Sequence, residues 1–310
     1  MLRKALAWHP PLMLFTLVMV ALVPLTGLAV LVDDRTLDGA PIWFKPFKFA
    51  VSFALYGATL SWAVSLPTRA RKVGRPLGTI IAVTSTIEMV IIVGQAARGQ
   101  HSHFNVSTTF DRALFIAMGL SVMFLWTSTA VIAALVAFST FVDKAAGTAL
   151  RYGLLISVAG LSVGFLMLVP TPEQIEDLSK GVTGVVGGHS VGVPDGGPSM
   201  AATGWNTTGG DLRVPHFLGM HALQALPLFA AALGFIRSPR LADGRTRSQL
   251  VRLAAGLYAG LFALTLWQSL RGQAVTAPDA PTLLALAALL AVIGLGAVRA
   301  LTSSTTAVPA

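Results

Sequence analysis

The chain has 310 residues, of which 54% are hydrophobic and 11% charged, with a mean hydropathy of +0.73. Soluble domains carry roughly 25% charged residues, so this composition excludes an ordinary soluble domain and is typical of a protein that crosses a membrane several times. There are no cysteines, which excludes a disulfide framework, a thiolate metal site and a cysteine nucleophile.

Eight apolar runs are long enough to cross the hydrocarbon core of a bilayer, which needs about 20 residues. The first run follows Arg3 and Lys4 and has no convincing small-residue cleavage site, so we interpret it as a retained helix. We therefore predict an all-α bundle of about eight transmembrane helices, with the lipid bilayer as its surroundings. In chain order, the predicted spans are Pro11–Val32, Phe47–Leu66, Leu77–Ala97, Leu114–Phe138, Leu150–Val169, His216–Ile236, Val251–Leu270 and Thr282–Leu301.

The connections between these spans fall into two sets that differ in charge. One set holds fourteen of the 22 basic residues and two of the 13 acidic residues, whereas the alternate set holds eight basic and ten acidic residues. Because cytoplasmic loops are enriched in lysine and arginine, the basic set and both chain termini are predicted to be cytoplasmic. Every histidine except His9 then lies on or near the extracytoplasmic side. The same clustering argues against nucleic-acid binding as the reason for the net charge of +9.

The longest connection, residues 170–215, is predicted to be extracytoplasmic and is rich in glycine, proline, serine and threonine. A long segment without strong periodicity is either disordered or a functional lid or binding loop. Trp205 and several interspersed valines give this loop side chains to pack. We therefore expect a glycine-rich, ordered cap.

A short polar sequence, Gln-x-x-Arg-Gly-Gln, occurs at residues 95–100 and again at residues 268–273, each time at the end of an apolar run. A second match, Lys48-Phe49 with His216-Phe217, has a similar separation along the chain. We predict an internal duplication, a parallel repeat of four plus four helices. Its halves are residues 1–148 and residues 149–302, the second including loop 170–215, and residues 303–310 form a disordered cytoplasmic tail.

Glu88 lies near the middle of the third predicted span. An ionisable side chain inside the bilayer is costly unless it is paired or solvated, so its position is informative. Helical periodicity places Thr84, Gln95 and Arg98 on the same face. Two interpretations remain open: a proton or cation relay that opens outward, and a structural glutamate that pairs with another helix or stays protonated.

Lys48 lies near the outer end of the second predicted span, three residues after Lys45. A lysine in that position commonly extends its ammonium group to the interface. The two lysines also lie close in sequence to Asp33, Asp34 and Asp38. Structural ion pairing and substrate binding are the two interpretations of Lys48.

Pro215 directly precedes the sixth predicted span, which begins with His216 and contains His221 and Gln224. Proline is well placed at a helix start, and the i, i+3 spacing of His221 and Gln224 puts both side chains on one face. These three polar residues are candidates for hydrogen bonding, acid–base chemistry or ligand binding.

Five histidines are predicted to share one side of the membrane, where together with aspartate or glutamate they suit a Zn, Cu or non-haem Fe site, or the axial ligation of a haem. The opposing interpretation is hydrogen bonding or proton transfer. Two pairs of these histidines are close in sequence, His101 with His103 and His216 with His221. Neither spacing puts both side chains of a pair on one face of a helix. The five candidate metal or haem ligands are His101, His103, His189, His216 and His221.

Four stretches resemble a family of uncharacterised bacterial polytopic membrane proteins. This resemblance covers about a tenth of the chain and implies a bacterial inner-membrane location. It implies no activity. The stretches are Trp43-Phe44-Lys45-Pro46-Phe47-Lys48-Phe49, Gln95-Ala96-Ala97-Arg98-Gly99, Ser102-His103-Phe104-Asn105 and Gly210-Asp211-Leu212-Arg213-Val214-Pro215-His216-Phe217.

Three functional hypotheses follow. The first is a membrane enzyme or electron-transfer protein with a polar site near the extracytoplasmic face, dependent on a metal ion or haem. The second is a proton- or cation-coupled secondary transporter that uses Glu88. The third is a sensor or assembly factor that binds a partner through loop 170–215. For a small-molecule or ion ligand, His216, His221 and Glu88 are the candidate catalytic groups, and the candidate binding residues are Arg98, Arg271, Gln95, Gln268, Gln224 and Lys48.

Overall fold

The computed structural model describes residues 2–66, 71–182 and 184–303. Within these residues, seven helices are long and apolar enough to cross a membrane, and a bent pair brings the number to eight. The prediction of an all-helical, multi-pass membrane protein is therefore confirmed. The seven are α2 (Pro10–Val32), α3 (Phe44–Ser65), α4 (Arg71–Arg98), α5 (Thr109–Ala137), α6 (Lys144–Leu166), α11 (Gly244–Leu270) and α12 (Ala280–Ser303).

The bent pair replaces the single sixth span that the sequence predicted. It consists of α8 (Arg213–Met220) and α9 (Ala222–Phe235), which meet at His221 at an angle of 43°. The helix α8 begins three residues earlier than the predicted span. A Cβ atom on Gly219 would lie 2.5 Å from the Cα atom of Gly160, so α8 and α6 touch backbone to backbone just before the bend.

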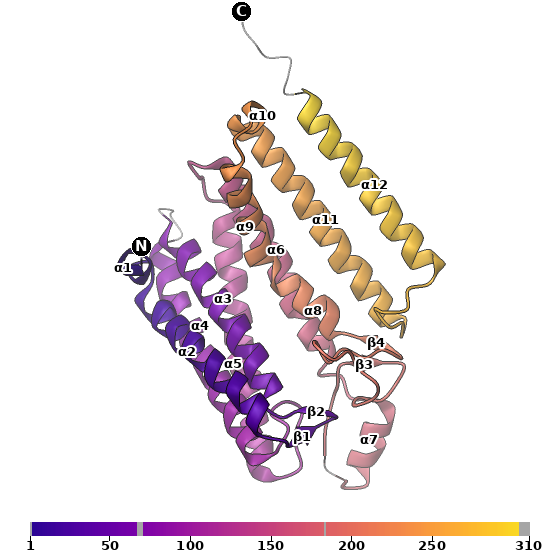
Figure 1. Cartoon of the computed structure of the whole chain (residues 1–310). Coiled ribbons are helices and arrows are strands. Elements are labelled where there is room, and N and C mark those ends of the chain that lie inside the picture. Colours follow the sequence, from indigo (N-terminus) through magenta and orange to yellow (C-terminus); the bar gives the residue numbers. More distant parts are fainter. Residues whose placement is uncertain (1, 67–70, 183, 304–310) are drawn as a thin grey trace, which may run out of the picture.

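The helices run side by side between two ends of different character (Figure 1). One end carries the short helices α1 (Leu2–Leu6) and α10 (Pro239–Ala242), and we call it the basic end. The other carries α7 (Pro172–Ser179) and two small hairpins, and we call it the capped end. The hairpins pair β1 (Thr36–Leu37) with β2 (Ala40–Pro41), and β3 (Ser190–Val191) with β4 (Gly210–Asp211), both antiparallel.

Most of segment 170–215 forms this cap instead of a structureless connection. Thr171 begins α7 with a capping box, in which its side chain accepts from the backbone of Gln174 and the Gln174 side chain bonds back. The Gln174 amide also binds the backbone of Gly187 at 2.9 Å, which ties α7 to the loop that follows. The described part of the segment therefore has secondary structure and cross-links, and its last residues belong to α8. The predicted tail, residues 303–310, lies outside the described residues apart from Ser303, where α12 ends.

Two hydrophobic clusters form most of the buried core. One hydrophobic cluster joins residues of α2, α3, α4, α5, α6 and α9, and a second joins α6, α9 and α11. By contrast, α12 packs mainly against α11 and exposes apolar residues such as Leu284. In a bilayer such exposed apolar faces meet lipid chains, so they need no protein partner.

Candidate functional site

A cavity of about 220 Å³ lies between the two predicted halves. Its walls come from α3, α4 and α5 on one side and from α6, α8 and α9 on the other, and residues 103–104 lie at its capped end. Most of the lining is apolar and aromatic. Six of its polar side chains are Glu88, His103, Ser157, His216, His221 and Gln224. The structure thus brings three of the five predicted histidines together with Glu88.

Glu88 is buried in α4, with 2% of the residue exposed. Its Oε2 atom lies 3.9 Å from Nε2 of His103, within ion-pair range but too far for a direct hydrogen bond. Its Oε1 atom has no hydrogen-bond partner among the described residues. Because a buried polar atom without a partner is costly, this oxygen indicates a place for a proton, a water molecule or a ligand.

His103 lies in the loop between α4 and α5 and connects Glu88 to a lysine. Its Nδ1 atom lies 3.2 Å from the Lys45 ammonium and 3.0 Å from the Ser102 hydroxyl, and both groups donate to it. The hydrogen of the neutral ring is therefore on Nε2, facing Glu88. Burial, followed by the charge of Lys45, lowers the pKa of His103 well below its usual value of 6.5. His103 is thus a neutral donor to the cavity.

His216 and His221 lie on the bent helix pair and have the opposite tautomer. Nδ1 of His216 donates to the Gly160 carbonyl at 2.7 Å, which leaves its Nε2 as an acceptor. Nδ1 of His221 donates to Oε1 of Gln224 at 3.2 Å, and its Nε2 accepts from Ser52 at 3.4 Å. The Gln224 amide nitrogen has no hydrogen-bond partner among the described residues.

The other two predicted ligands, His101 and His189, bind different partners. Nδ1 of His101 lies 3.5 Å from Asp38, and Nδ1 of His189 lies 3.2 Å from Asp195 and 3.8 Å from Asp211. Among the residues that the structure describes, no group of three or more His, Asp or Glu side chains is arranged to hold a metal ion. The five histidines therefore do not gather as one ligand set.

The two Gln-x-x-Arg-Gly-Gln sequences form corners at the capped end. Arg98 pairs with Asp111 at 2.9 Å, and Arg271 pairs with Asp279. The Gln95 amide donates to the carbonyl of His101 at 3.1 Å and to Asp111 at 2.9 Å. Both guanidinium groups thus pair with an aspartate of the chain itself, whereas the sequence made both arginines candidates to bind a small-molecule or ion ligand.

The second corner repeats the glutamine contact. The Gln268 amide donates to the Ala274 carbonyl at 2.8 Å, six residues further along, as Gln95 does to His101. Neither glutamine lines the cavity. In this structure the glutamines close the turns after α4 and α11.

Lys48 holds the cap instead of pairing with the nearby aspartates. Its ammonium donates to the Thr203 carbonyl at 2.8 Å, and it lies 4.5 Å from the centre of the Phe44 ring. Asp33 pairs with Arg35 at 2.7 Å. Lys48 therefore fastens the cap segment to α3.

Sequence reasoning missed Ser157 of α6, which is 1% exposed and has no described partner for its hydroxyl. A serine in an apolar helix carries no signal, because most such hydroxyls bond to a carbonyl one turn earlier in their own helix. Ser162, five residues further along α6, does so by donating to the Val158 carbonyl at 2.8 Å.

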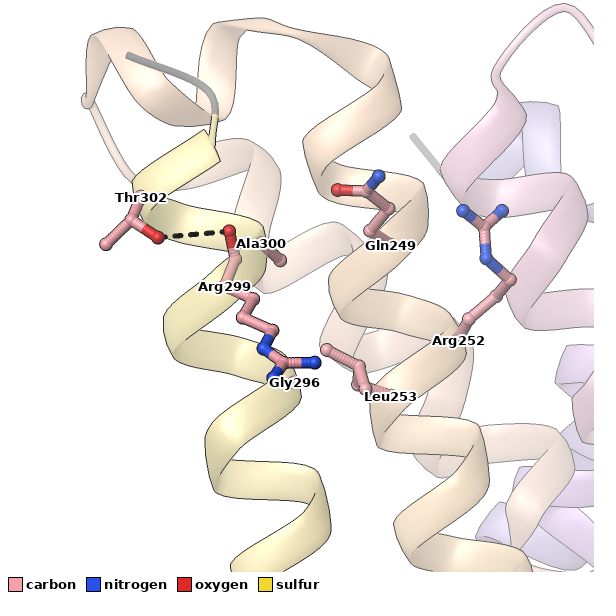
Figure 2. A pocket seen from close by; sticks show the side chains of 7 residues that line it. All are labelled: Gln249, Arg252, Leu253, Gly296, Arg299, Ala300 and Thr302. Carbon is pink, nitrogen blue, oxygen red and sulfur yellow. Dashed lines mark hydrogen bonds between the residues drawn. The ribbon is translucent and has the colours of Figure 1, made fainter. Parts of the chain in front are cut away.

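A larger and more open groove of about 710 Å³ lies between α11 and α12 at the basic end (Figure 2). The side chains of Arg252 and Arg299 lie on either side of Leu253 there, and both arginines are exposed. The groove contains none of the buried polar groups described above. Glu88 and the three histidines make the interhelical cavity the candidate site.

Comparisons with known protein families, curated proteins and solved structures find no match for this chain. Its function is therefore inferred from the geometry of the cavity.

Proposed function

We propose that the chain is a multi-pass protein of a bacterial inner membrane, with its capped end extracytoplasmic and both termini cytoplasmic. The charge distribution supports this orientation, because fourteen of the 22 basic residues belong to the set of connections that includes both termini. The helices α1 and α10, at the end opposite the cap, contain or adjoin such residues (Figure 1). The resemblance noted above supports the bacterial location.

We also propose that residues 1–148 and 149–302 are duplicated halves. The two corners support this proposal, because Gln95 and Gln268 bind carbonyls six residues on, at 3.1 and 2.8 Å. The glycines that follow, Gly99 and Gly272, have φ angles of +74° and +71°. Corners that agree in sequence, hydrogen bonds and backbone conformation are the expected remains of a duplication.

We propose that the cavity binds a small ligand and exchanges protons with it, as in a membrane enzyme or electron-transfer protein. The observation that carries the proposal is Oε1 of Glu88, a buried carboxyl oxygen that has no partner in the described part of the chain and shares one cavity with His103, His216 and His221. Buried titratable groups that converge on a mostly apolar cavity are typical of a functional site.

Each group has a distinct chemical role in this proposal. Glu88 supplies or takes up a proton at Oε1, and the Nε2 hydrogen of His103 faces its other oxygen. His216 presents an acceptor, because the Gly160 carbonyl fixes its hydrogen on Nδ1. The cavity thus holds a proton donor and a proton acceptor, as general acid–base chemistry requires.

A lipid-soluble carbodiimide tests this role of Glu88, because it reacts with a protonated carboxyl group inside a membrane. We expect mass spectrometry to find Glu88 labelled with a single-proton pH dependence, and His103→Gln to shift the midpoint. Glu173, exposed on α7, serves as the internal control and should react with a water-soluble carbodiimide. Absence of labelling at every pH, or labelling that does not change with pH, would contradict the proposal.

The cofactor hypothesis has its own measurement. If a haem or metal ion belongs to the site, the purified protein has a Soret band or about one equivalent of Fe, Cu or Zn per chain. Replacing His216 and His221 with alanine then removes it. A colourless, metal-free preparation assigns the proton chemistry to the side chains alone.

A proton-coupled secondary transporter is the second candidate, favoured by the position of the cavity between the proposed halves. Transporters built from repeats commonly bind their substrate at such an interface. Glu88→Gln in proteoliposomes distinguishes the two candidates. If the chain is a transporter, the wild type shows proton-coupled uptake and the variant loses it. If the chain is an enzyme, neither protein shows uptake, and the variant loses catalytic turnover. The third hypothesis, partner binding through loop 170–215, is tested by deleting residues 184–204.

A further inference from the structure

The cavity opens toward the lipid. Three of its lining residues are exposed, Gly119 and Met123 of α5 and Leu168 just after α6, while the rest are half-buried or buried. Met123 is 48% and Leu168 45% exposed. A Cβ atom at Gly119 would meet nothing within 4 Å. Because α5 and α6 both have the length and hydropathy of membrane spans, this opening faces the bilayer.

Hydrogen bonds tie the cap to the wall of the cavity at its capped end. The amide of Val186 donates to the Phe104 carbonyl at 2.8 Å, and that of Gly188 donates to the Met167 carbonyl at 2.9 Å. Phe104 and Met167 both line the cavity, so the cap lies directly behind its wall. The cap thus covers this end, which favours the opening beside α5 as the route of a ligand.

Polar atoms without partners lie inside this apolar shell. Beside Oε1 of Glu88, the hydroxyl of Ser157 and the amide nitrogen of Gln224 have no hydrogen-bond partner among the described residues, and all three residues are at most 7% exposed. The Gln224 amide nitrogen is a donor only, and the serine hydroxyl can donate as well. The site therefore offers two donors to a ligand that carries acceptor oxygens.

The walls and the volume restrict the shape of the ligand. The rings of Phe49, Phe104, Phe115, Phe165 and Phe217 line the cavity and suit a flat ring. Pockets that enclose a whole drug-sized ligand measure roughly 300–1,000 Å³. A volume of about 220 Å³ therefore fits a head group, with the rest of the molecule in the lipid.

We propose that the ligand is a lipid-soluble quinone, whose ring lies in the cavity with its carbonyl oxygens accepting from Gln224 and Ser157. Its apolar chain leaves between α5 and α6 beside Gly119. This inference rests on the proposed function, since it places the ring in the same cavity as Glu88 and His216.

The test is equilibrium binding of decyl-benzoquinone to the protein in lipid nanodiscs. Quenching of tryptophan fluorescence measures the binding. Trp126 is a suitable reporter, because its ring lies 5.5 Å from that of Phe165. We expect saturable quenching for the wild type, and its loss in Gly119→Phe, which fills the opening. Gly94→Phe is the matched control: it makes the same change at an exposed glycine of α4 with open space around it.

The head-group contacts are tested by Gln224→Leu and Ser157→Ala. Each variant removes one donor, so the dissociation constant of decyl-benzoquinone should rise about tenfold. Decanol, which has the chain without the ring, should not compete. Absence of saturable binding, or decanol competing as well as the quinone, would overturn the quinone assignment.

Binding that is unaffected by Gly119→Phe would overturn the route through the membrane. If this variant does not fold, Gly119→Val makes a smaller obstruction at the same place. Failure of the quinone to bind while Glu88 still shows pH-dependent carbodiimide labelling would contradict this inference alone. Failure of that labelling would contradict the proposed proton chemistry itself.

Discussion

The two corners at residues 95–100 and 268–273 are built alike but lie in different surroundings. In both, a glutamine amide binds the carbonyl six residues on, a glycine with positive φ ends the helix, and an arginine pairs with an aspartate. Asp111 at the first corner is 2% exposed, whereas the Asp279 side chain at the second is 33% exposed. The same sequence thus makes one buried corner and one surface corner.

The corners also differ in the titratable residues that lie near them in the sequence. Glu88 precedes Gln95 by seven residues, and the residue seven before Gln268 is Leu261. The loop after the first corner carries His103, which lines the cavity, whereas the loop after the second has no histidine. The repeated motif thus shapes the backbone in both halves, whereas Glu88 and His103 of the candidate site have no equivalent near the second corner.

The largest expected loss of stability comes from replacing the aspartates that pair with the two corner arginines. Asp111→Ala removes a buried acceptor from Arg98, Gln95 and Thr108, and should lower the free energy of unfolding by about 2 kcal/mol. Asp279→Ala should cost clearly less, because its ion pair is open to solvent. Thermal unfolding of the purified variants in detergent measures both, and equal losses would contradict the assigned difference in burial.

A second prediction concerns pH. Burial lowers the pKa of His103 well below 6.5, so this ring stays neutral in the folded protein while it titrates normally in the unfolded chain. The contribution of the neutral ring to the free energy of unfolding is complete above pH 6.5. Below that pH it falls by about 1.4 kcal/mol per pH unit, down to the pKa of His103 in the folded protein. The difference in thermal stability between wild type and His103→Gln should change with pH below 6.5. A pH-independent difference would show that His103 titrates normally when folded.

The smallest expected effects concern the glycines with positive φ that both corners share. Gly99→Ala and Gly272→Ala each force a side chain into the left-handed region, and each should cost about 1 kcal/mol of stability. Gly94→Ala, in the helical part of α4, should be neutral or stabilising by less than about 1 kcal/mol. The same unfolding assay reads all three. A loss at only one corner would argue that the corners are not equivalent.

The sequence predicted the spans well, because apolar runs of about 20 residues have few alternatives in a membrane protein. It also selected Glu88, His103, His216 and His221, the polar residues that converge on the cavity. The break at His221 was not predictable. Beside the break, α8 lies against Gly160 in a close contact that only the tertiary structure contains.

Roles were harder to predict than positions. Arg98 and Arg271 have the chemistry to hold an anion, but their partner aspartates lie thirteen and eight residues further along the chain. Which carboxylate a guanidinium meets depends on the corner between them. Likewise, His101 and His103 are two residues apart yet bind Asp38 and face Glu88 respectively.

The central claim is that the cavity between the halves holds a small molecule. Its most direct test is mass spectrometry of the intact, folded protein, released from its own membranes together with whatever it binds. We predict one small-molecule adduct per chain in the wild type and in Glu173→Gln, whose site is untouched. The Ser157→Ala, Gln224→Leu double variant should lose this adduct. A wild-type protein without an adduct, or an adduct that the double variant retains in full, would contradict the account.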